Sequence, residues 1–216
     1  MKLNTKKIYI IRHGETEYNK SGIVQGSGVD SALNANGLKQ ANLFFNAYKH
    51  MPFELIYTSL LKRTVQSVQK FIDLGIPHRK LKELNEISWG KSEGVPFNSE
   101  SNKKYNGIIE SWKKGNVSLS LDGGESPEQV QVRQRKALSV ILRGKEKLVL
   151  ISMHGRAMKI MLAWLTGLEI KDMDLFDHDN LSLYVLDYNG KDFIIERSND
   201  LSHLRGFKPQ HNEQFS

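Results

Sequence analysis

The chain has 216 residues, 24.7 kDa and 39% hydrophobic residues, enough for one α/β domain with a sizeable core. It contains no cysteine, which excludes disulfides, thiolate metal sites and a cysteine nucleophile. It also has no run of eighteen apolar residues and no basic-then-apolar leader at its start. We therefore expect a cytoplasmic protein with no membrane partner.

The chain is basic, with 31 Lys and Arg against 24 Asp and Glu and a formal net charge of +7. A positive balance favours an anionic partner, but it does not choose between a polynucleotide, a membrane surface and a small phosphorylated metabolite. The lysines are scattered, in short pairs such as Lys103-Lys104 and Lys113-Lys114. No dense basic run marks a nucleic-acid-binding arm, so we expect a small-molecule ligand.

Short apolar runs alternate with helical patterns along the chain. Strands that are covered on both faces have near-continuous apolar sequences. Helices show apolar residues at spacings of three and four, as in Leu38 to Tyr48, Val65 to Ile72 and Met158 to Leu165. The alternation predicts an α/β fold. The apolar runs lie at residues 8–11, 53–57, 148–151 and 183–186.

The sequence "SPEQV" predicts the start of another helix, with Ser126 as N-cap, Pro127 at the first helical position and Gln129 completing a capping box. This helix should run to about Leu142. Residues 90–122 differ, because Gly, Ser, Asn and Lys dominate there. We interpret them as a helical excursion within a single domain of residues 1–216.

The only periodic signal in the excursion is Tyr105, Ile108, Ile109 and Trp112. One hypothesis is that this helix partly covers the binding crevice and sets substrate choice, with the nearby lysines reaching a second negative group on the substrate. The alternative is that its apolar stripe packs onto the core and its lysines are merely exposed.

Cationic residues follow three of the predicted strands. The first strand ends in Arg12, His13 and Gly14, and the strand "LVLISM" ends in His154 and Gly155. Arg63 lies at the start of the helix that follows the second strand. We expect Gly14 to allow a sharp turn, and we expect all these groups at the carboxyl edge of the sheet, where α/β folds bind ligands.

A cluster of like charges repels itself unless an anion is bound, and a phosphate dianion fits best. Arg12 and Arg63 offer forked donors to phosphoryl oxygens. One of the two histidines could attack phosphorus if its ring were neutral, which nearby arginines favour. Glu86 in "LNEISWG" lies among apolar residues, and we expect burial to keep it protonated as an acid for the leaving group.

These residues resemble the histidine phosphatase superfamily, in its phosphoglycerate mutase-like branch. The similar blocks, in order, are "RHGETEYN", "TSLLKRTVQS", "LNEISWGKSEG", "GGES" and "MHGRAMK". The resemblance implies a three-layer α/β/α fold with a mostly parallel central sheet. Departures from the usual pattern are Met153, Leu60 and Ser92, none of which removes a catalytic group.

The resemblance also implies roles. His13 would be the nucleophile, which becomes transiently phosphorylated, and Glu86 the proton donor. Arg12, Arg63 and His154 would bind the phosphoryl group. Asn19, Gln25 and Gly155 would help to hold the substrate. No metal and no cofactor is implied, because the arginines supply the electrostatic stabilisation.

Four interpretations compete at this stage. A phosphomonoester hydrolase is favoured over a cofactor-dependent phosphoglycerate mutase, since the stretch between Glu86 and Gly124 is shorter than the mutase pattern. A non-catalytic phosphate-binding module should have lost His13 or Glu86, and both are present. In "DHDN", Asp177 to Asp179 could ligate a metal, but a turn is the commoner role of such residues. The substrate and the oligomeric state stay open.

Overall fold

The computed structural model describes residues 5–96 and 99–207 and is built on a six-stranded sheet with the order β3-β2-β4-β1-β5-β6. The neighbours from β3 to β1 are parallel, whereas β5 runs antiparallel to β1 and β6 antiparallel to β5. The expected mostly parallel sheet is therefore confirmed. The strands are β1 (Lys6–Arg12), β2 (Leu55–Thr58), β3 (His78–Lys80), β4 (Leu148–Met153), β5 (Leu183–Tyr188) and β6 (Phe193–Asp200).

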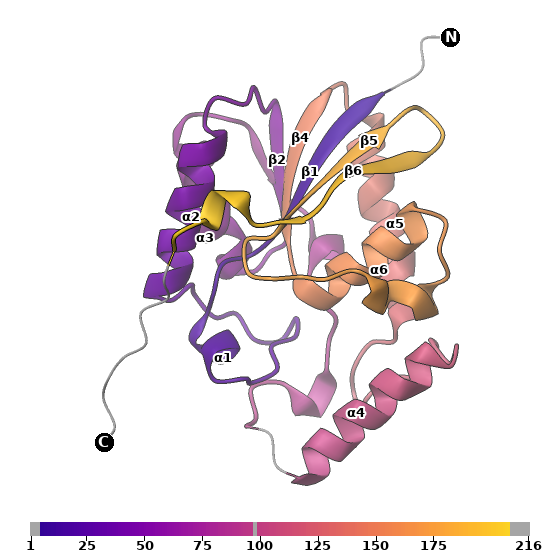
Figure 1. Ribbon diagram of the computed structural model, residues 1–216. Helices are drawn as coiled ribbons and strands as arrows, with labels where there is room; N and C mark the ends of the chain where they lie inside the picture. Colours follow the sequence, from indigo (N-terminus) through magenta and orange to yellow (C-terminus); the bar gives the residue numbers. More distant parts are fainter. Residues whose placement is uncertain (1–4, 97–98, 208–216) are drawn as a thin grey trace, which may run out of the picture.

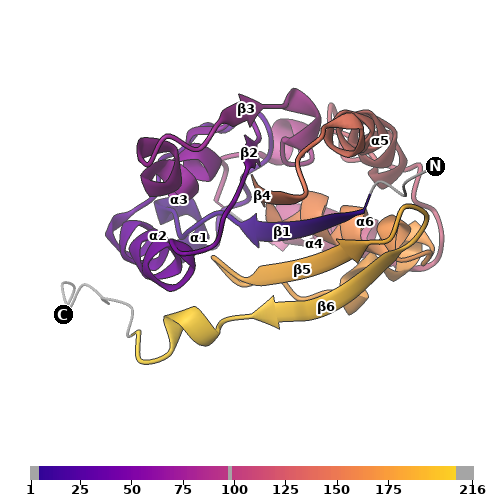
Figure 2. The ribbon, with the colours of Figure 1, turned by 90° about the horizontal axis from the view of Figure 1, so that it is seen from above.

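Helices cover both faces of the sheet, so the predicted three-layer arrangement is also confirmed. Figure 2 shows α2 and α3 on one side and α5 and α6 on the other. In Figure 1, α1 and α4 lie beyond the lower edge, where β1 ends. The helices are α1 (Glu17–Lys20), α2 (Ala35–Tyr48), α3 (Lys62–Asp73), α4 (Ser99–Lys113), α5 (Pro127–Arg143) and α6 (Gly155–Leu165), with 3₁₀ turns η1 (Lys82–Leu84), η2 (Gly90–Ser92), η3 (Ile170–Leu175) and η4 (Ser202–Leu204).

The four predicted strands are all present, and two edge strands were missed. Strand β3 consists of three polar residues, His-Arg-Lys, and pairs with β2 alone. Strand β6 pairs with β5 alone and is largely exposed. Strand β3 has no apolar residue, and β6 has apolar residues only at its start, Phe193 to Ile195, so neither shows the longer apolar run of a central strand.

Alternate residues of β1 serve two separate cores. Ile8 and Ile10 pack with α5 and α6 residues such as Ile141 and Met161, on one face. Tyr9 and Ile11 belong to the cluster on the other face. Because side chains alternate along a strand, burial on both faces requires the continuous apolar run seen in the sequence. This run anchors the strand whose end carries Arg12 and His13.

The start of α5 was predicted correctly from its capping signal. The Ser126 hydroxyl accepts from the Gln129 N–H, and the Gln129 side chain accepts from the Ser126 N–H at 2.8 Å. This reciprocal pair satisfies two otherwise unpaired donors. At the other end, buried Lys6 donates to the carbonyl of Gly144 at 2.7 Å, just past the last helical residue Arg143.

No helix in the part of the chain that the structure describes is long and apolar enough to cross a membrane.

Candidate active site

The two strand ends that carry histidines in the sequence meet at one point of the sheet. Arg12 pairs in register with Met153, so His13 and His154 follow directly from neighbouring parallel strands, β1 and β4. The His13 N–H donates to the Met153 carbonyl at 3.0 Å, which continues the ladder beyond the strand. The two imidazole rings lie edge to face with centroids 5.2 Å apart. The predicted convergence of these histidines is confirmed.

The ring of His13 is held in one tautomer. Its Nδ1 lies 2.7 Å from the Gly14 carbonyl oxygen, and a carbonyl can only accept, so Nδ1 carries the proton. Burial, together with the charges of Arg63 and Arg12, lowers the pKa of His13 well below its usual value. A neutral ring therefore keeps the lone pair of Nε2, and His13 lines a small cavity.

Gly14 is needed for space rather than for a special backbone angle. A Cβ at this position would lie 2.8 Å from the carbonyl oxygen of Gly37 and 2.9 Å from Leu181. Gly14 is not among the described glycines with positive φ, so the sharp turn that the sequence suggested is not the reason for this residue. Gly14 has no side chain, which allows α2 to approach the backbone next to His13 closely.

The guanidinium of Arg12 lines the same cavity with an unsatisfied donor. Its Nη1 donates to the His178 carbonyl at 2.6 Å, whereas its buried Nε has no partner among the described residues. A Cβ on Gly155 would lie 3.4 Å from this Nε and 3.2 Å from the His178 ring. An unpaired buried donor is unfavourable and calls for a ligand that accepts from it. An anionic oxygen satisfies that requirement.

Arg63 and His154 are fully buried behind His13 and are absent from the residues that line the cavity. Arg63 donates from Nε to His154 Nδ1 at 3.2 Å and from Nη1 to the Val29 carbonyl at 2.6 Å. His154 Nδ1 thus accepts, which places the proton on Nε2, 2.9 Å from the Ser59 hydroxyl. Burial and Arg63 lower the pKa of His154 well below its usual value. Direct contact of these two side chains with a phosphoryl group stays a prediction.

Asn19 and Gln25 both line the cavity and are fixed by Thr16. Asn19 forms a capping box with Thr16 at the start of α1, and its Oδ1 also accepts from Asn180 at 3.2 Å. Gln25 donates from Nε2 to the Thr16 hydroxyl at 2.6 Å. The structure therefore brings these two predicted substrate-binding residues to the same site as His13.

Glu86 reaches the cavity from the loop after η1 and is buried, as expected. Its two oxygens accept from backbone N–H groups of Arg156 at 3.1 Å and Ala157 at 2.8 Å, in the first turn of α6. A third bond comes from the N–H of Ile87 at 2.9 Å. These contacts aim the carboxyl group at the same cavity as His13. Its protonated state stays a prediction.

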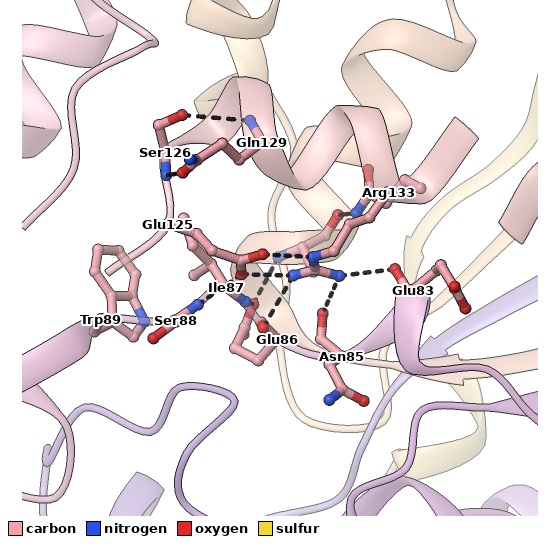
Figure 3. A network of polar contacts seen from close by, with 12 residues as sticks. Glu83, Asn85, Glu86, Ile87, Ser88, Trp89, Glu125, Ser126, Gln129 and Arg133 are labelled. Carbon is pink, nitrogen blue, oxygen red and sulfur yellow. Dashed lines mark hydrogen bonds and ion pairs between the residues drawn. The ribbon is translucent and has the colours of Figure 1, made fainter. Parts of the chain in front are cut away.

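The loop that carries Glu86 is held by Arg133 of α5, a residue that the sequence analysis missed (Figure 3). Its guanidinium donates to the carbonyls of Glu83, Asn85 and Glu86 at 2.7 to 3.0 Å. It also pairs with Glu125 at 2.9 Å. The signal available in the sequence was the "GGES" block, since Glu125 belongs to it and also accepts from the Ser88 N–H.

The cavity has a volume of about 150 Å³, below the range of roughly 300–1,000 Å³ typical of drug-sized ligands. A small metabolite fits this size. Further lining residues that the sequence analysis did not assign to the site come from several elements. They are Ile23, Val24, Trp89, Tyr105, Arg156 and His178.

Both hypotheses for the excursion helix hold in part. Tyr105 of α4 lines the cavity, so the helix partly covers it. Trp112 is buried in the core, as the alternative required. The α4 lysines do not line the cavity: Lys104 pairs with Glu100 and Lys113 with Glu110, all exposed.

The segment "DHDN" forms a turn into β5, as interpreted, with the Ser182 N–H donating to the Asp179 carbonyl. Within residues 5–96 and 99–207, no group of three or more His, Asp and Glu residues is arranged to hold a metal ion. His178 instead faces Arg12, with Nδ1 3.4 Å from Nη1. Burial and this charge lower the pKa of His178 to about 3.

Comparison with known proteins agrees with this geometry. Residues 8–201 match the profile of the histidine phosphatase superfamily (branch 1). The chain belongs to this superfamily. Its relatives in the superfamily include "Putative phosphoserine phosphatase 2" of Hydrogenobacter thermophilus, 28% identical over 93% of this chain and 98% of that protein.

Two further relatives define the range of the similarity. "Probable phosphoglycerate mutase GpmB" of Yersinia pestis is 29% identical over 92% of this chain and 94% of that protein. The solved structure of YhfR from Bacillus stearothermophilus superposes with a TM-score of 0.80 at 25% identity, covering 92% of this chain and 99% of that one. The similarity therefore extends over nearly the whole chain, both to a relative named as a phosphatase and to one named as a mutase.

Proposed function

We propose that this protein is a metal-independent phosphomonoester hydrolase that acts through a phosphohistidine at His13 on a small phosphorylated metabolite in the cytoplasm. The observation that carries the proposal is the neutral His13 ring, whose Nδ1 is tied to Gly14 while Nε2 is left to the cavity beside Arg12 and Glu86. The phosphatase relative, aligned over nearly its whole length, supports the reaction class.

In the first step the lone pair of His13 Nε2 attacks phosphorus, and the bond from phosphorus to the ester oxygen breaks. Glu86 gives its proton to the departing oxygen. The unpaired Nε of Arg12 offers a hydrogen bond to a phosphoryl oxygen, with Asn19, Gln25 and the N-terminal turn at Gly155 around it. Arg63 adds positive charge behind His13, and the neutral ring of His154 bonds to Arg63 there.

In the second step a water molecule attacks the phosphorus of phosphohistidine, and the nitrogen–phosphorus bond breaks. The carboxylate of Glu86 takes the proton from this water and is thereby restored as an acid. The products are inorganic phosphate, the alcohol and the original neutral imidazole. No step in this scheme calls on a metal ion, because guanidinium groups balance the phosphoryl charge.

A cofactor-dependent mutase is the second candidate, and the GpmB relative favours it. A mutase must keep water from the phosphohistidine until the phosphoryl group returns to substrate. Among the described residues between Glu86 and α5, the one α-helix is α4, which reaches the cavity through Tyr105. We favour hydrolysis for this reason. A non-catalytic binding module is the third candidate, and the paired presence of His13 and Glu86 in one cavity argues against it.

The test is a phosphate-release screen over sugar phosphates, phosphoglycerates, nucleotides and phosphopeptides, with and without bisphosphoglycerate. We expect release without the bisphosphate, in the presence of a chelator, and its loss in the His13→Ala variant. Isomerisation that depends on the bisphosphate identifies a mutase instead. Activity that is lost in chelator and restored by a divalent ion contradicts the metal-independent scheme.

A further inference from the structure

A second guanidinium group lines the cavity and is assigned no role by the reaction scheme. Arg156 lies in the first turn of α6, one position after Gly155, and lines the cavity together with Arg12 and His13. Its backbone N–H holds Glu86 at 3.1 Å, which fixes where the side chain begins relative to the acid. The cavity therefore carries a second cationic group beside those assigned to the phosphoryl group.

The guanidinium of Arg156 is held in place before any ligand binds. Its Nη1 donates to Asp174 at 2.7 Å, and its plane lies over the Trp112 ring at 5.8 Å. The side chain is only 11% exposed. An arginine that is already ordered loses little freedom when it binds a ligand, so its remaining donors are prepared for one.

The charge of Arg156 is only partly balanced by its partner. Asp174 also accepts from Lys159 at 3.0 Å, and Lys159 is itself only 12% exposed. One carboxylate therefore serves two largely buried cations. The Arg156 side chain forms one hydrogen bond within the described part of the chain, through Nη1, and its other N–H groups are open to a ligand. The site as a whole retains a positive charge that an anion would neutralise.

We propose that Arg156 binds a second negative group of the substrate, and that the preferred substrates are compact phosphomonoesters bearing a carboxylate. This inference rests on the proposed function for the position of the phosphoryl group. A guanidinium fork matches a carboxylate through two parallel hydrogen bonds.

The proposal replaces the hypothesis that lysines of α4 meet the second negative group. None of the α4 lysines lines the cavity, and Lys104 and Lys113 pair with exposed glutamates, whereas Arg156 borders the cavity itself. The role of α4 becomes indirect: its Trp112 supports the Arg156 plane, and its Tyr105 packs on Trp89 with centroids 5.0 Å apart. Substrate choice thus depends on α6 and α4 together.

The test compares two esters of the same skeleton, 3-phosphoglycerate and glycerol 3-phosphate, which differ in a carboxylate against a hydroxymethyl group. In the wild type we expect kcat/KM for 3-phosphoglycerate to exceed that for glycerol 3-phosphate by more than tenfold. In Arg156→Gln this ratio should fall at least tenfold, mainly because the carboxylate ester binds more weakly and its KM rises. A ratio measured on one sample does not depend on the folded fraction, so partial unfolding does not mimic the effect. Arg156→Lys should restore only part of the ratio.

Lys70→Ala is the matched control, because it removes an equal charge from an exposed residue of α3 outside the cavity lining. It should leave the ratio unchanged. An unchanged ratio in Arg156→Gln, or equal slowing of both esters, overturns the proposal while leaving hydrolysis intact.

A binding arm separates this proposal from the proposed function. If the wild type releases no phosphate from either ester, the hydrolase proposal fails. Titration of the two esters into the His13→Ala variant then tests separately whether Arg156 binds the carboxylate. Tighter binding of 3-phosphoglycerate that disappears in His13→Ala/Arg156→Gln supports it. Equal affinities for the two esters overturn it.

Discussion

His13 shows how neighbouring atoms define a chemical role for a single side chain. The Gly14 carbonyl fixes the proton on Nδ1, and burial with Arg63 and Arg12 keeps the ring neutral. Imidazole is reactive as a nucleophile only in that form. Glu86 complements it, because backbone N–H groups of α6 hold its oxygens at the same cavity.

The acid role of Glu86 gives a prediction based on leaving groups. We expect Glu86→Gln to lower kcat/KM by about 10²–10⁴-fold for alkyl phosphates, because their alkoxides need a proton as they depart. Nitrophenyl phosphate should slow far less, since its phenolate leaves without help. Steady-state kinetics on both esters measures the difference, and equal slowing of the two removes Glu86 from this role.

At this scale the sequence predicted which residues converge but not how each one is used. Arg12, His13, Asn19, Gln25, Glu86 and Gly155 all border one cavity. Arg63 and His154 bond to each other behind His13, and their contact with a phosphoryl group stays a prediction. Strand order determines the edge at which a side chain lies, whereas its direction depends on packing that no local pattern encodes. His178 was considered only as a metal ligand or turn residue, and Arg156 lay inside the "MHGRAMK" block without an assigned role.

At the scale of elements, the Glu86 loop depends on α5 through Arg133. Its guanidinium bonds to three carbonyls of the loop and to Glu125. A loop without regular hydrogen bonds needs such partners to stay in one conformation. Arg133 is thus a positioning residue for the acid.

Replacing Arg133 should therefore affect the chemistry of Glu86. We expect Arg133→Gln to lower kcat on alkyl phosphates about tenfold or more, because small displacements of a catalytic group are costly. The informative readout is the leaving-group dependence, which should shift toward that of Glu86→Gln. Arg135→Gln on the same helix, whose guanidinium lies over Trp164, is the control and should show the wild-type dependence. A merely structural role for Arg133 would slow both kinds of ester alike.

The capping box of α5 offers a stability prediction at the same scale. Ser126 and Gln129 satisfy each other's backbone donors. Ser126→Ala should lower the free energy of unfolding by about 1 kcal/mol, since one N–H group loses its acceptor. Denaturant titration monitored by circular dichroism measures the loss, and Ser126→Asp should recover most of it. A change near zero would mean that water replaces the cap.

The long helices and central strands could be predicted from the sequence, because a central strand is apolar on both faces and a helix is apolar on one. The predicted end of α5, about Leu142, lies within a residue of the observed end at Arg143. The edge strands β3 and β6 were not predicted, because β3 is polar throughout and β6 is apolar only over its first three residues. The position of α4 against Trp89 was equally hidden, since it depends on contacts between segments far apart in the chain.

At the scale of the whole molecule, neutral histidines that are buried or partly buried make stability depend on pH. Burial lowers the pKa of His13, His154 and His178 below the usual value, to about 3 for His178. As pH falls from about 6.5, the unfolded chain binds protons that the folded protein does not, so unfolding becomes more favourable. Each such histidine contributes up to about 1.4 kcal/mol per pH unit in that window.

We therefore expect the free energy of unfolding to fall steeply between about pH 7.5 and about pH 5.5, on either side of the ordinary histidine pKa. His178→Asn should show a shallower fall than the wild type, by about 1.4 kcal/mol over this interval, because one proton-binding site is removed from the unfolded chain. Urea titrations at the two pH values measure both slopes. Identical slopes in the two proteins would contradict a neutral, partly buried His178.

The attachment of α4 has a consequence for how this fold can diversify. Helix α4 packs Trp112 and Tyr105 on Trp89, whereas the nucleophile lies at the sheet edge after β1 and the acid lies on the loop after η1. A chimera that exchanges residues 99–113 for the matching piece of a relative should leave the reaction running and retarget it to a different ester. Replacement of this segment is thus a route by which substrate selectivity changes while the catalytic residues stay the same.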